Sequence, residues 1–217
     1  MKVSFLIPTY NRLEFVKAQV ACLKELKIQH HIDIEIVIGD NSTTEDISNY
    51  VQHLDDCDIA YFKNDGNVGY GKNVSNCYKI ATGDYIWLLG DKRYPSEESF
   101  PEVLSLIEMG IYDAILVANA NSNEKLISIT ELNTLVSTFG FRLSNLTGTI
   151  LRRECLDTLD RCDKYVEYNF SHIGVALEYL ASLQTCNAVW YTRNVCLTRT
   201  TNMTYWRNNV FRVFSHD

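Results

Sequence analysis

The sequence predicts an α/β fold in a single domain, with a Rossmann-like, mostly parallel central sheet flanked by helices. Three observations predict it. Short apolar segments alternate with segments of helical periodicity along the first half of the chain. The 217 residues, 46% of them hydrophobic, suffice for one full core. Polar loops follow four successive predicted strands, and strands joined by helices of this length favour parallel pairing with right-handed crossovers.

The first half supplies the regular alternation. Residues 2–8 are apolar and strand-like, and the helix predicted at 12–27 repeats apolar residues at Phe15, Val16, Val20, Leu23 and Leu26. The pattern then predicts strands at 33–39, 59–63 and 85–89, with helices at 44–54 and 71–81 between them. Thr43 or Thr44 is placed to cap the helix at 44–54.

The second half is less regular. A helix at 99–109 and a strand at 112–119 continue the alternation, after which the spacing loosens. Strands at 148–153 and 188–193 and a helix near 172–184 are still expected. We therefore expect the sheet to become mixed in this half.

Composition and charge exclude several classes of protein. A net charge of −7 argues against nucleic-acid binding, which usually needs a basic face. The seven cysteines show no C-x-x-C pair or zinc-ligand spacing, which indicates reduced core thiols in a cytoplasmic protein. No apolar run approaches the roughly 20 residues that span a bilayer, and no signal peptide is expected.

The C-terminal segment from Tyr205 interleaves aromatic and apolar residues with Arg207 and Arg212. Three interpretations stay open: a last core helix, a peripheral helix on the inner face of the cell membrane, or the start of a continuation.

Four polar loops follow predicted strands. They are PTYNR, DNSTTED, NDGNVGYGKN and GDKR. Ligands of open α/β sheets bind at the carboxyl ends of strands, so these loops predict one shared binding edge. Asp40 and Asn41 offer acceptors for a base or ribose, although a turn with a helix cap would explain them too. Gly66, Gly69 and Gly71 permit close backbone approach, and Lys72 could meet a phosphate.

Other nucleotide and hydrolase motifs are missing. The sequence has no GxxxxGK[ST] loop, no third glycine of a dinucleotide fingerprint and no G-x-S-x-G elbow.

The four loops together resemble the family 2 glycosyltransferases, which have a GT-A fold. VSFLIPTYNR, IVIGDNSTTED and NVGYGKNVSNCYKIATGDYIWLLGD are similar, in that order, to the family's motifs from about residue 3 to 95. The likeness is weaker from residue 96 onward. It implies one GT-A domain, with a nucleotide-sugar-binding half at 1–95 and an acceptor-binding half at 96–217.

The resemblance implies a hexosyltransferase-like enzyme that moves a sugar from a nucleotide diphosphate donor, with UDP favoured, to an acceptor hydroxyl. Inversion at the anomeric carbon is expected, in the synthesis of surface polysaccharide or another glycan on a glycan or lipid-linked acceptor. The positions carried over to the nucleotide pocket are Pro8, Thr9, Tyr10, Arg12, Asp40, Asn67, Gly69, Lys72, Asp91 and Lys92.

The family's metal-binding D-x-D motif is incomplete here. Its positions hold Gly90, Asp91 and Lys92, so Asp91 is the metal and catalytic candidate, and dependence on Mn²⁺ or Mg²⁺ is expected to be reduced. Lys92 or Arg93 would then face the diphosphate. The alternative is that both basic side chains point to solvent.

The family's Glu-Asp pair is also missing, since NFSHIGVALEYL occupies its place. Ser171 is expected to cap a helix there, and His172 is a candidate catalytic base, metal ligand or structural residue. Glu167 is a weaker alternative base. Two other functions stay open: a degenerate nucleotide-sugar-binding subunit without turnover, and a sugar nucleotidylyltransferase.

Overall fold

Strand β1 (Lys2–Thr9) is an inner strand of the larger sheet, in a computed structural model that describes residues 1–54, 56, 58–90, 92–117, 122–157 and 159–198. It pairs in parallel with β2 (Asp33–Asp40) on one side and β4 (Tyr85–Leu88) on the other. Strand β3 (Ile59–Lys63) adds in parallel outside β2. Inner parallel strands are covered on both faces, which is why β1 is apolar nearly throughout.

The remaining strands make the sheet mixed, as expected. Strand β8 (Thr149–Arg152) runs antiparallel between β4 and β6 (Ala114–Val117). Strand β9 (Ala188–Tyr191) is parallel to β6, and β7 (Leu126–Ile129) closes that side antiparallel. The eight strands are ordered β3-β2-β1-β4-β8-β6-β9-β7.

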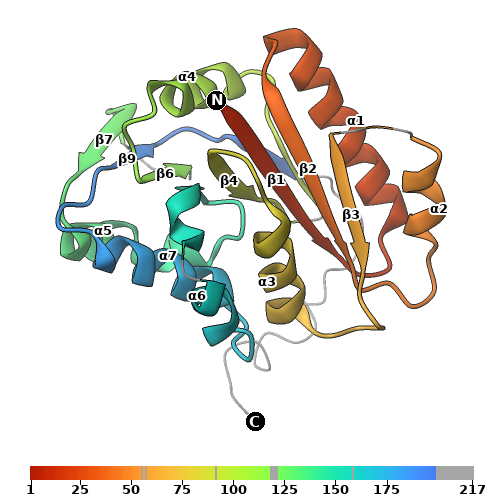
Figure 1. Ribbon diagram of the computed structural model, residues 1–217. Helices are drawn as coiled ribbons and strands as arrows, with labels where there is room; N and C mark the ends of the chain where they lie inside the picture. Colours follow the sequence, from red (N-terminus) through yellow and green to blue (C-terminus); the bar gives the residue numbers. More distant parts are fainter. Residues whose placement is uncertain (55, 57, 91, 118–121, 158, 199–217) are drawn as a thin grey trace.

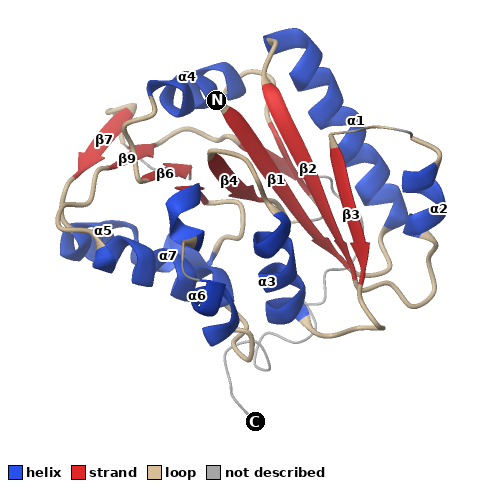
Figure 2. Cartoon of the chain, viewed as in Figure 1, coloured by secondary structure: helices blue, strands red, loops and turns tan. Residues whose placement is uncertain are grey.

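Helices cover both faces of this sheet (Figures 1 and 2). On one face α1 (Leu13–His30), α2 (Ile47–Gln52) and α4 (Phe100–Met109) share a core with Phe5, Ile7 and Trp87. The other face packs Leu6 and Leu88 against α3, α5, α6 and α7. These helices span Tyr70–Ile80, Leu132–Phe139, Leu159–Lys164 and Ser171–Ser182, with short 3-10 turns η1 and η2 at Gly140–Ser144 and Arg153–Leu156.

Two predicted helix caps are wrong. Asp46 caps α2, its carboxylate accepting from Asn49 N, because the helix begins at Ile47 and not at the predicted residue 44. The backbone N–H groups of Thr43 and Thr44 donate to Asn11. Phe170 precedes α7, and Ser171 lies inside the helix with a buried hydroxyl that has no hydrogen-bond partner in the part of the chain described.

The sequence pattern missed β5 (Arg93–Pro95), β7, α5 and α6. Strand β5 pairs with β10 (Cys196–Thr198) in a separate two-stranded sheet, and three residues are too few to show a period. The strand predicted at 112–119 begins two residues later, and its last two positions lie outside the described residues.

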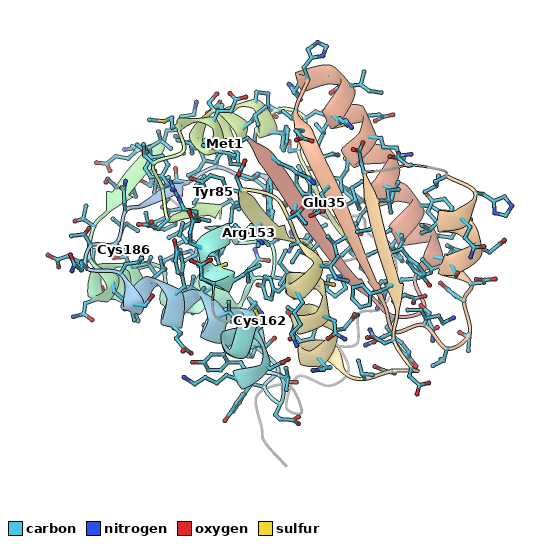
Figure 3. All side chains as sticks on the ribbon, viewed as in Figure 1. Met1, Glu35, Tyr85, Arg153, Cys162 and Cys186 are labelled. Atoms are coloured by element: carbon cyan, nitrogen blue, oxygen red, sulfur yellow. The ribbon has the colours of Figure 1, made fainter. Side chains whose placement is uncertain are left out.

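Glu35 of β2 lies near the amino edge of the sheet (Figure 3). Its carboxylate accepts hydrogen bonds from Ser4 Oγ and from the N–H and hydroxyl of Thr82. Burial alone would raise the pKa of Glu35, but these hydrogen bonds hold it below the ordinary value. The Glu35 carboxylate is therefore satisfied by groups of the fold itself.

The six cysteines that the structure describes form no disulfide with one another, and five of them are buried. Within the described ranges every helix is too short or too polar to cross a lipid bilayer. The C-terminal segment from Tyr205 lies outside the described residues.

Candidate functional site

The carboxyl ends of the first three strands meet at one edge of the sheet, where their arrowheads converge in Figure 1. The register puts Thr9 beside Asp40 and Asp40 beside Lys63. Strand β4 runs the same way next to β1, so its following loop reaches this edge as well. The four polar loops therefore converge as the sequence predicted.

Asp40 is fully buried at this edge and both of its carboxylate oxygens accept hydrogen bonds. Ser42 N donates to Oδ1 at 2.6 Å, and the Tyr61 hydroxyl donates to Oδ2 at 2.9 Å. Burial and then the neighbouring carboxylate raise the pKa of Tyr61, so the phenol keeps its proton for this bond. Asp40 thus fixes the turn after β2 besides being a candidate nucleotide contact.

The first two loops are joined through Asn11. Its backbone is in the left-handed region at φ 50°, and its side-chain oxygen accepts from Thr43 N and Thr44 N. Among its neighbours, Tyr10 is 46% exposed, whereas Thr9 is buried and its hydroxyl has no hydrogen-bond partner in the described chain. Pro8 is half-buried. The segment thus presents one exposed ring and one unpartnered buried hydroxyl at the candidate site.

A network of asparagines links the second and third loops to α3. Asn41 Nδ2 donates to Asn67 Oδ1 and to the Gly69 carbonyl, both at 3.1 Å. Asn64 donates to Asn41 and to Asn73, and Asn73 Nδ2 reaches the Gly39 carbonyl at 2.9 Å. Gly69 has φ +83°, a conformation that favours glycine. The network holds these loops without using Asp40.

The loop after β4 is held by Gln19 of α1. This fully buried amide donates to the carbonyls of Gly90 and Arg93 at 2.8 and 2.7 Å, and Arg93 N closes the turn onto Gly90 O. Asp91, the metal and catalytic candidate, lies outside the described residues. Sequence reasoning missed Gln19, although a polar residue among the apolar positions of a helix is a signal for such a role.

Lys92 and Arg12 lie on the same aromatic ring. Lys92 Nζ is 5.3 Å from the centre of the Phe15 ring, and Arg12 Cζ is 5.7 Å from it. Lys92 is only 8% exposed, so the alternative that both Lys92 and Arg93 point to solvent is wrong for Lys92. Two predicted nucleotide-binding cations thereby meet between the ends of β1 and β4.

Lys72 forms its ion pair with a residue far away in the sequence. Its Nζ lies 3.1 Å from Asp163 Oδ1 in α6, and Ser75 Oγ and Lys79 Nζ donate to the same carboxylate. Hydrogen bonds from Lys79 and Ser75 lower the pKa of Asp163 well below its ordinary value. Contact between Lys72 and a phosphate stays a prediction. For that contact the Lys72 ammonium would have to bind the phosphate alongside Asp163 or give up its ion pair with Asp163.

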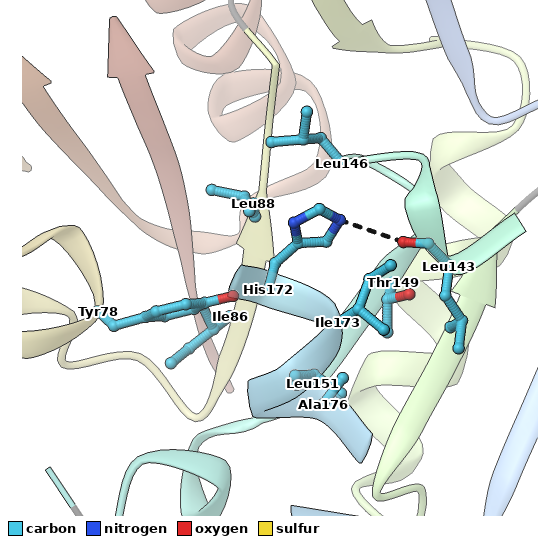
Figure 4. Close-up of a pocket in the computed structure, with 10 residues that line it drawn as sticks. All are labelled: Tyr78, Ile86, Leu88, Leu143, Leu146, Thr149, Leu151, His172, Ile173 and Ala176. Carbon is cyan, nitrogen blue, oxygen red and sulfur yellow. Dashed lines mark hydrogen bonds between the residues drawn. The ribbon is translucent and has the colours of Figure 1, made fainter. Parts of the chain in front are cut away.

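His172 is buried among apolar residues at the start of α7 (Figure 4), 7% exposed. Nε2 lies 3.1 Å from the Leu143 carbonyl, which only accepts, so Nε2 carries the proton. Nδ1 therefore accepts from the Tyr70 hydroxyl at 3.0 Å. Burial lowers the pKa of His172 from 6.5 to about 4. In this arrangement neither ring nitrogen is open to an acceptor hydroxyl.

Glu167, the other candidate base, is exposed on the segment between α6 and α7. The carbonyl of the preceding Val166 packs so closely on Gly71 that a Cβ there would lie 2.1 Å from it. Because Gly71 is the second residue of α3 and belongs to the third polar loop, Glu167 lies beside the binding edge. In the residues that the structure describes, no three His, Cys, Asp or Glu side chains gather as a metal site.

Comparisons with known proteins agree with this arrangement. Residues 4–171 match the sequence profile of the family Glycosyl transferase family 2. Abequosyltransferase RfbV of Salmonella typhimurium is 24% identical over 203 residues, covering 82% of this chain and 60% of the relative. A GalNAc(5)-diNAcBac-PP-undecaprenol beta-1,3-glucosyltransferase of Campylobacter jejuni is 31% identical over 93 residues, covering 42% of this chain and 29% of that protein.

Among solved structures, TarS 1-349 of S. aureus in complex with UDP-GlcNAc superposes with a TM-score of 0.67 at 18% identity. The superposition covers 94% of this chain and 60% of TarS 1-349. The chain thus spans about 60% of the length of RfbV and of this structure. The likeness to TarS bears on the fold and supports the GT-A arrangement of the sheet.

Proposed function

Because the chain belongs to glycosyl transferase family 2, we propose that it transfers a sugar from a nucleoside diphosphate donor to an acceptor hydroxyl, with inversion. The acceptor oxygen forms a bond to the anomeric carbon while the bond from that carbon to the diphosphate breaks. The acceptor proton goes to a base, and the electron pair leaves on the diphosphate oxygen. Binding without turnover is the alternative that the assay below separates.

The observation that carries this proposal is the pair of cations at the Phe15 ring. Lys92 and Arg12 lie at the carboxyl ends of β4 and β1, next to the loops in which a nucleotide would lie. Cations fixed in a partly buried site stabilise charge that develops on a leaving group. Their position supports a role in neutralising the departing diphosphate.

The nucleotide would lie over the first three loops. Asp40, Asn67 and Gly69 fix those loops, and the exposed Tyr10 ring offers a surface for a base. We favour UDP as the nucleotide, in keeping with the UDP-GlcNAc of the TarS complex. Surface polysaccharide is the proposed product class; one relative is named an abequosyltransferase, and another is named as a glucosyltransferase of an oligosaccharide linked to PP-undecaprenol.

The divalent metal of the family is only partly provided for. Asp91 is the residue that would hold Mg²⁺ or Mn²⁺ on the diphosphate, where the ion would withdraw charge from the leaving group. Lys92 occupies the place of the second acid and, as an ammonium, supplies no lone pair to a metal. We therefore propose that the two cations take over part of the metal's role.

For the base we propose Glu167, an exposed carboxylate beside the first turn of α3. His172 is proposed as a positioning residue, because its two nitrogens tie Tyr70 of α3 to Leu143 of η1. We also keep the proposal that the segment from Tyr205 lies on anionic membrane, which co-sedimentation with anionic liposomes at low salt tests.

The test of the proposed function is release of nucleoside diphosphate from a panel of UDP-, GDP-, CDP- and dTDP-sugars, with and without acceptor glycans. We expect release with a UDP-sugar, accelerated by acceptor. Binding of a nucleotide without release in any combination would support the degenerate subunit, and no binding of any nucleotide contradicts the proposal.

A further inference from the structure

A second hollow lies beside the candidate site, on the side of the acceptor half. Its volume is about 300 Å³, and residues from separate segments line it. Arg93 follows directly on Lys92, Val117 ends β6, and Arg142 comes from η1. Because β4 and β6 are both antiparallel to β8, they run in the same direction, and the carboxyl end of β6 lies at the same edge of the sheet as the four polar loops.

The charge of the hollow is opposite to that of the chain. Two arginines line it and none of the lining residues that the structure describes is a carboxylate, in a protein of net charge −7. Neither guanidinium forms an ion pair with any described residue, although nine other cationic side chains have such pairs. Two guanidinium groups that line one cavity without an ion pair favour an anionic ligand.

Arg142 is held in position by aromatic rings. Its guanidinium lies 4.9 Å from the centre of Phe141 and 5.1 Å from that of Trp190. Trp190 is buried in β9 and packs edge-on against Phe139, whereas Phe141 is 78% exposed. A guanidinium stacked between rings loses little freedom when it binds a carboxylate or phosphate. The exposed Phe141 ring adds an apolar surface that suits one face of a sugar.

The neutral polar groups complete a sugar-sized site. Asn145 Oδ1 accepts from the Thr147 hydroxyl at 3.1 Å, which leaves its amide N–H groups for a ligand, and the exposed Asn194 also lines the hollow. A cavity of this volume is at the lower end of those that hold small ligands.

We propose that this hollow is the acceptor subsite and that it selects an acceptor sugar carrying an anionic group, a carboxylate or a phosphate. Arg142 and Arg93 bind the anion, and Phe141 packs on the sugar ring. The inference rests on the proposed function only where it identifies the bound sugar as the acceptor. The other source of an anion is the diphosphate of the donor, and the experiment separates the two.

The test titrates glucuronate, glucose 6-phosphate and glucose into the full chain, with and without UDP, by ligand-observed NMR. We expect both charged sugars to bind about tenfold or more tightly than glucose. Arg142→Met should reduce their affinity to that of glucose and leave UDP affinity unchanged. Asn145→Asp should also reduce the affinity of the charged sugars to that of glucose, because its negative charge repels their anionic group. The variant keeps an acceptor oxygen for the Thr147 hydroxyl.

Arg153→Met is the matched control. Arg153 is exposed near the start of β4, where its backbone N donates to Asp84 O (Figure 3). The substitution therefore removes one positive charge at a place away from the hollow. Its sugar affinities should equal those of the wild type.

Three outcomes overturn the inference: equal binding of the three sugars, no binding of any, or weaker UDP binding by Arg142→Met, which would assign the anion to the donor. If Arg142→Met fails to fold, Asn145→Asp decides. Failure of the proposed function is seen separately, as no nucleotide binding or release, because the sugar titration without UDP does not depend on it.

Discussion

The hydroxyl of Tyr70 donates to Nδ1 of His172 across 3.0 Å, although 102 residues separate them in the sequence. Tyr70 belongs to the third polar loop and is the first residue of α3, and the other nitrogen of His172 reaches η1, which carries Arg142. One neutral imidazole thus joins the candidate nucleotide loop to the hollow proposed for the acceptor. This contact has consequences for stability and for catalysis that can be measured separately.

Stability should fall in mild acid because of His172. Its pKa is lowered from 6.5 to about 4 in the folded chain, so between these values the unfolded state binds the extra proton. The free energy of unfolding therefore decreases as the pH falls from 6.5 to about 4, by about 3 kcal/mol in total. Above pH 6.5 the imidazole is neutral in both states and this loss is absent. Urea denaturation across this range measures it.

His172→Gln is the control for that measurement, since a glutamine amide can still donate to the Leu143 carbonyl but does not titrate. The variant should lose the part of the pH slope that lies between about 4 and 6.5. An identical slope in wild type and variant would show that His172 is not the group responsible.

Glu167→Gln should lower kcat by about a hundredfold or more if Glu167 accepts the acceptor proton. His172→Gln should cost less than about tenfold, because a positioning residue does not take part in the proton transfer. Steady-state kinetics on both variants, with their thermal stability, compare them. Near-native turnover of Glu167→Gln, together with a large loss in His172→Gln, would restore His172 as the base.

Asp40→Ala should weaken binding of UDP by about 1 to 3 kcal/mol if a nucleotide shares its buried carboxylate. The change also removes acceptors for Ser42 N and Tyr61, so the variant should be less stable. Tyr61→Phe is the matched control, because it removes one of these bonds and leaves the carboxylate. Calorimetric titration decides: equal UDP affinity in folded Asp40→Ala and wild type removes Asp40 from the site.

Lys92→Ala should reduce turnover by about a hundredfold if its ammonium neutralises the leaving diphosphate. EDTA should then have a limited effect on the wild type, and added Mn²⁺ should only partly compensate the variant. The assay is nucleoside diphosphate release with EDTA or Mn²⁺. Activity abolished by EDTA and indifferent to Lys92→Ala would instead assign the charge to a metal held by Asp91.

Gly71→Ala should disturb the approach of the segment around Glu167, because the new Cβ would lie 2.1 Å from the Val166 carbonyl. The expected cost is about 1 to 3 kcal/mol of stability, with kcat lowered and nucleotide affinity nearly kept. Gly140→Ala is the control, since a Cβ at Gly140 meets nothing within 4 Å. Equal stability of the two variants would contradict the close contact.

The sequence by itself determined the strands and helices of the first half and the edge at which the polar loops meet. Strand β3 lies at the predicted residues, β1 and β2 each extend one residue further, and α3 is shifted by one residue toward the N-terminus. The helical and the strand periods of apolar residues are local, because each appears within a few neighbouring residues. Parallel connections then bring the carboxyl ends of successive strands to one edge of the sheet.

The tertiary structure alone decided which partners the polar groups have. Lys72 pairs with a residue 91 positions later, His172 is satisfied by Tyr70 and Leu143, and Lys92 lies buried against Phe15. The hollow of Arg93 and Arg142 likewise joins segments that share no local pattern. Periodicity reports which face of an element is buried, whereas a charge partner depends on how distant elements pack. That packing follows from the whole core, which no short stretch of sequence contains.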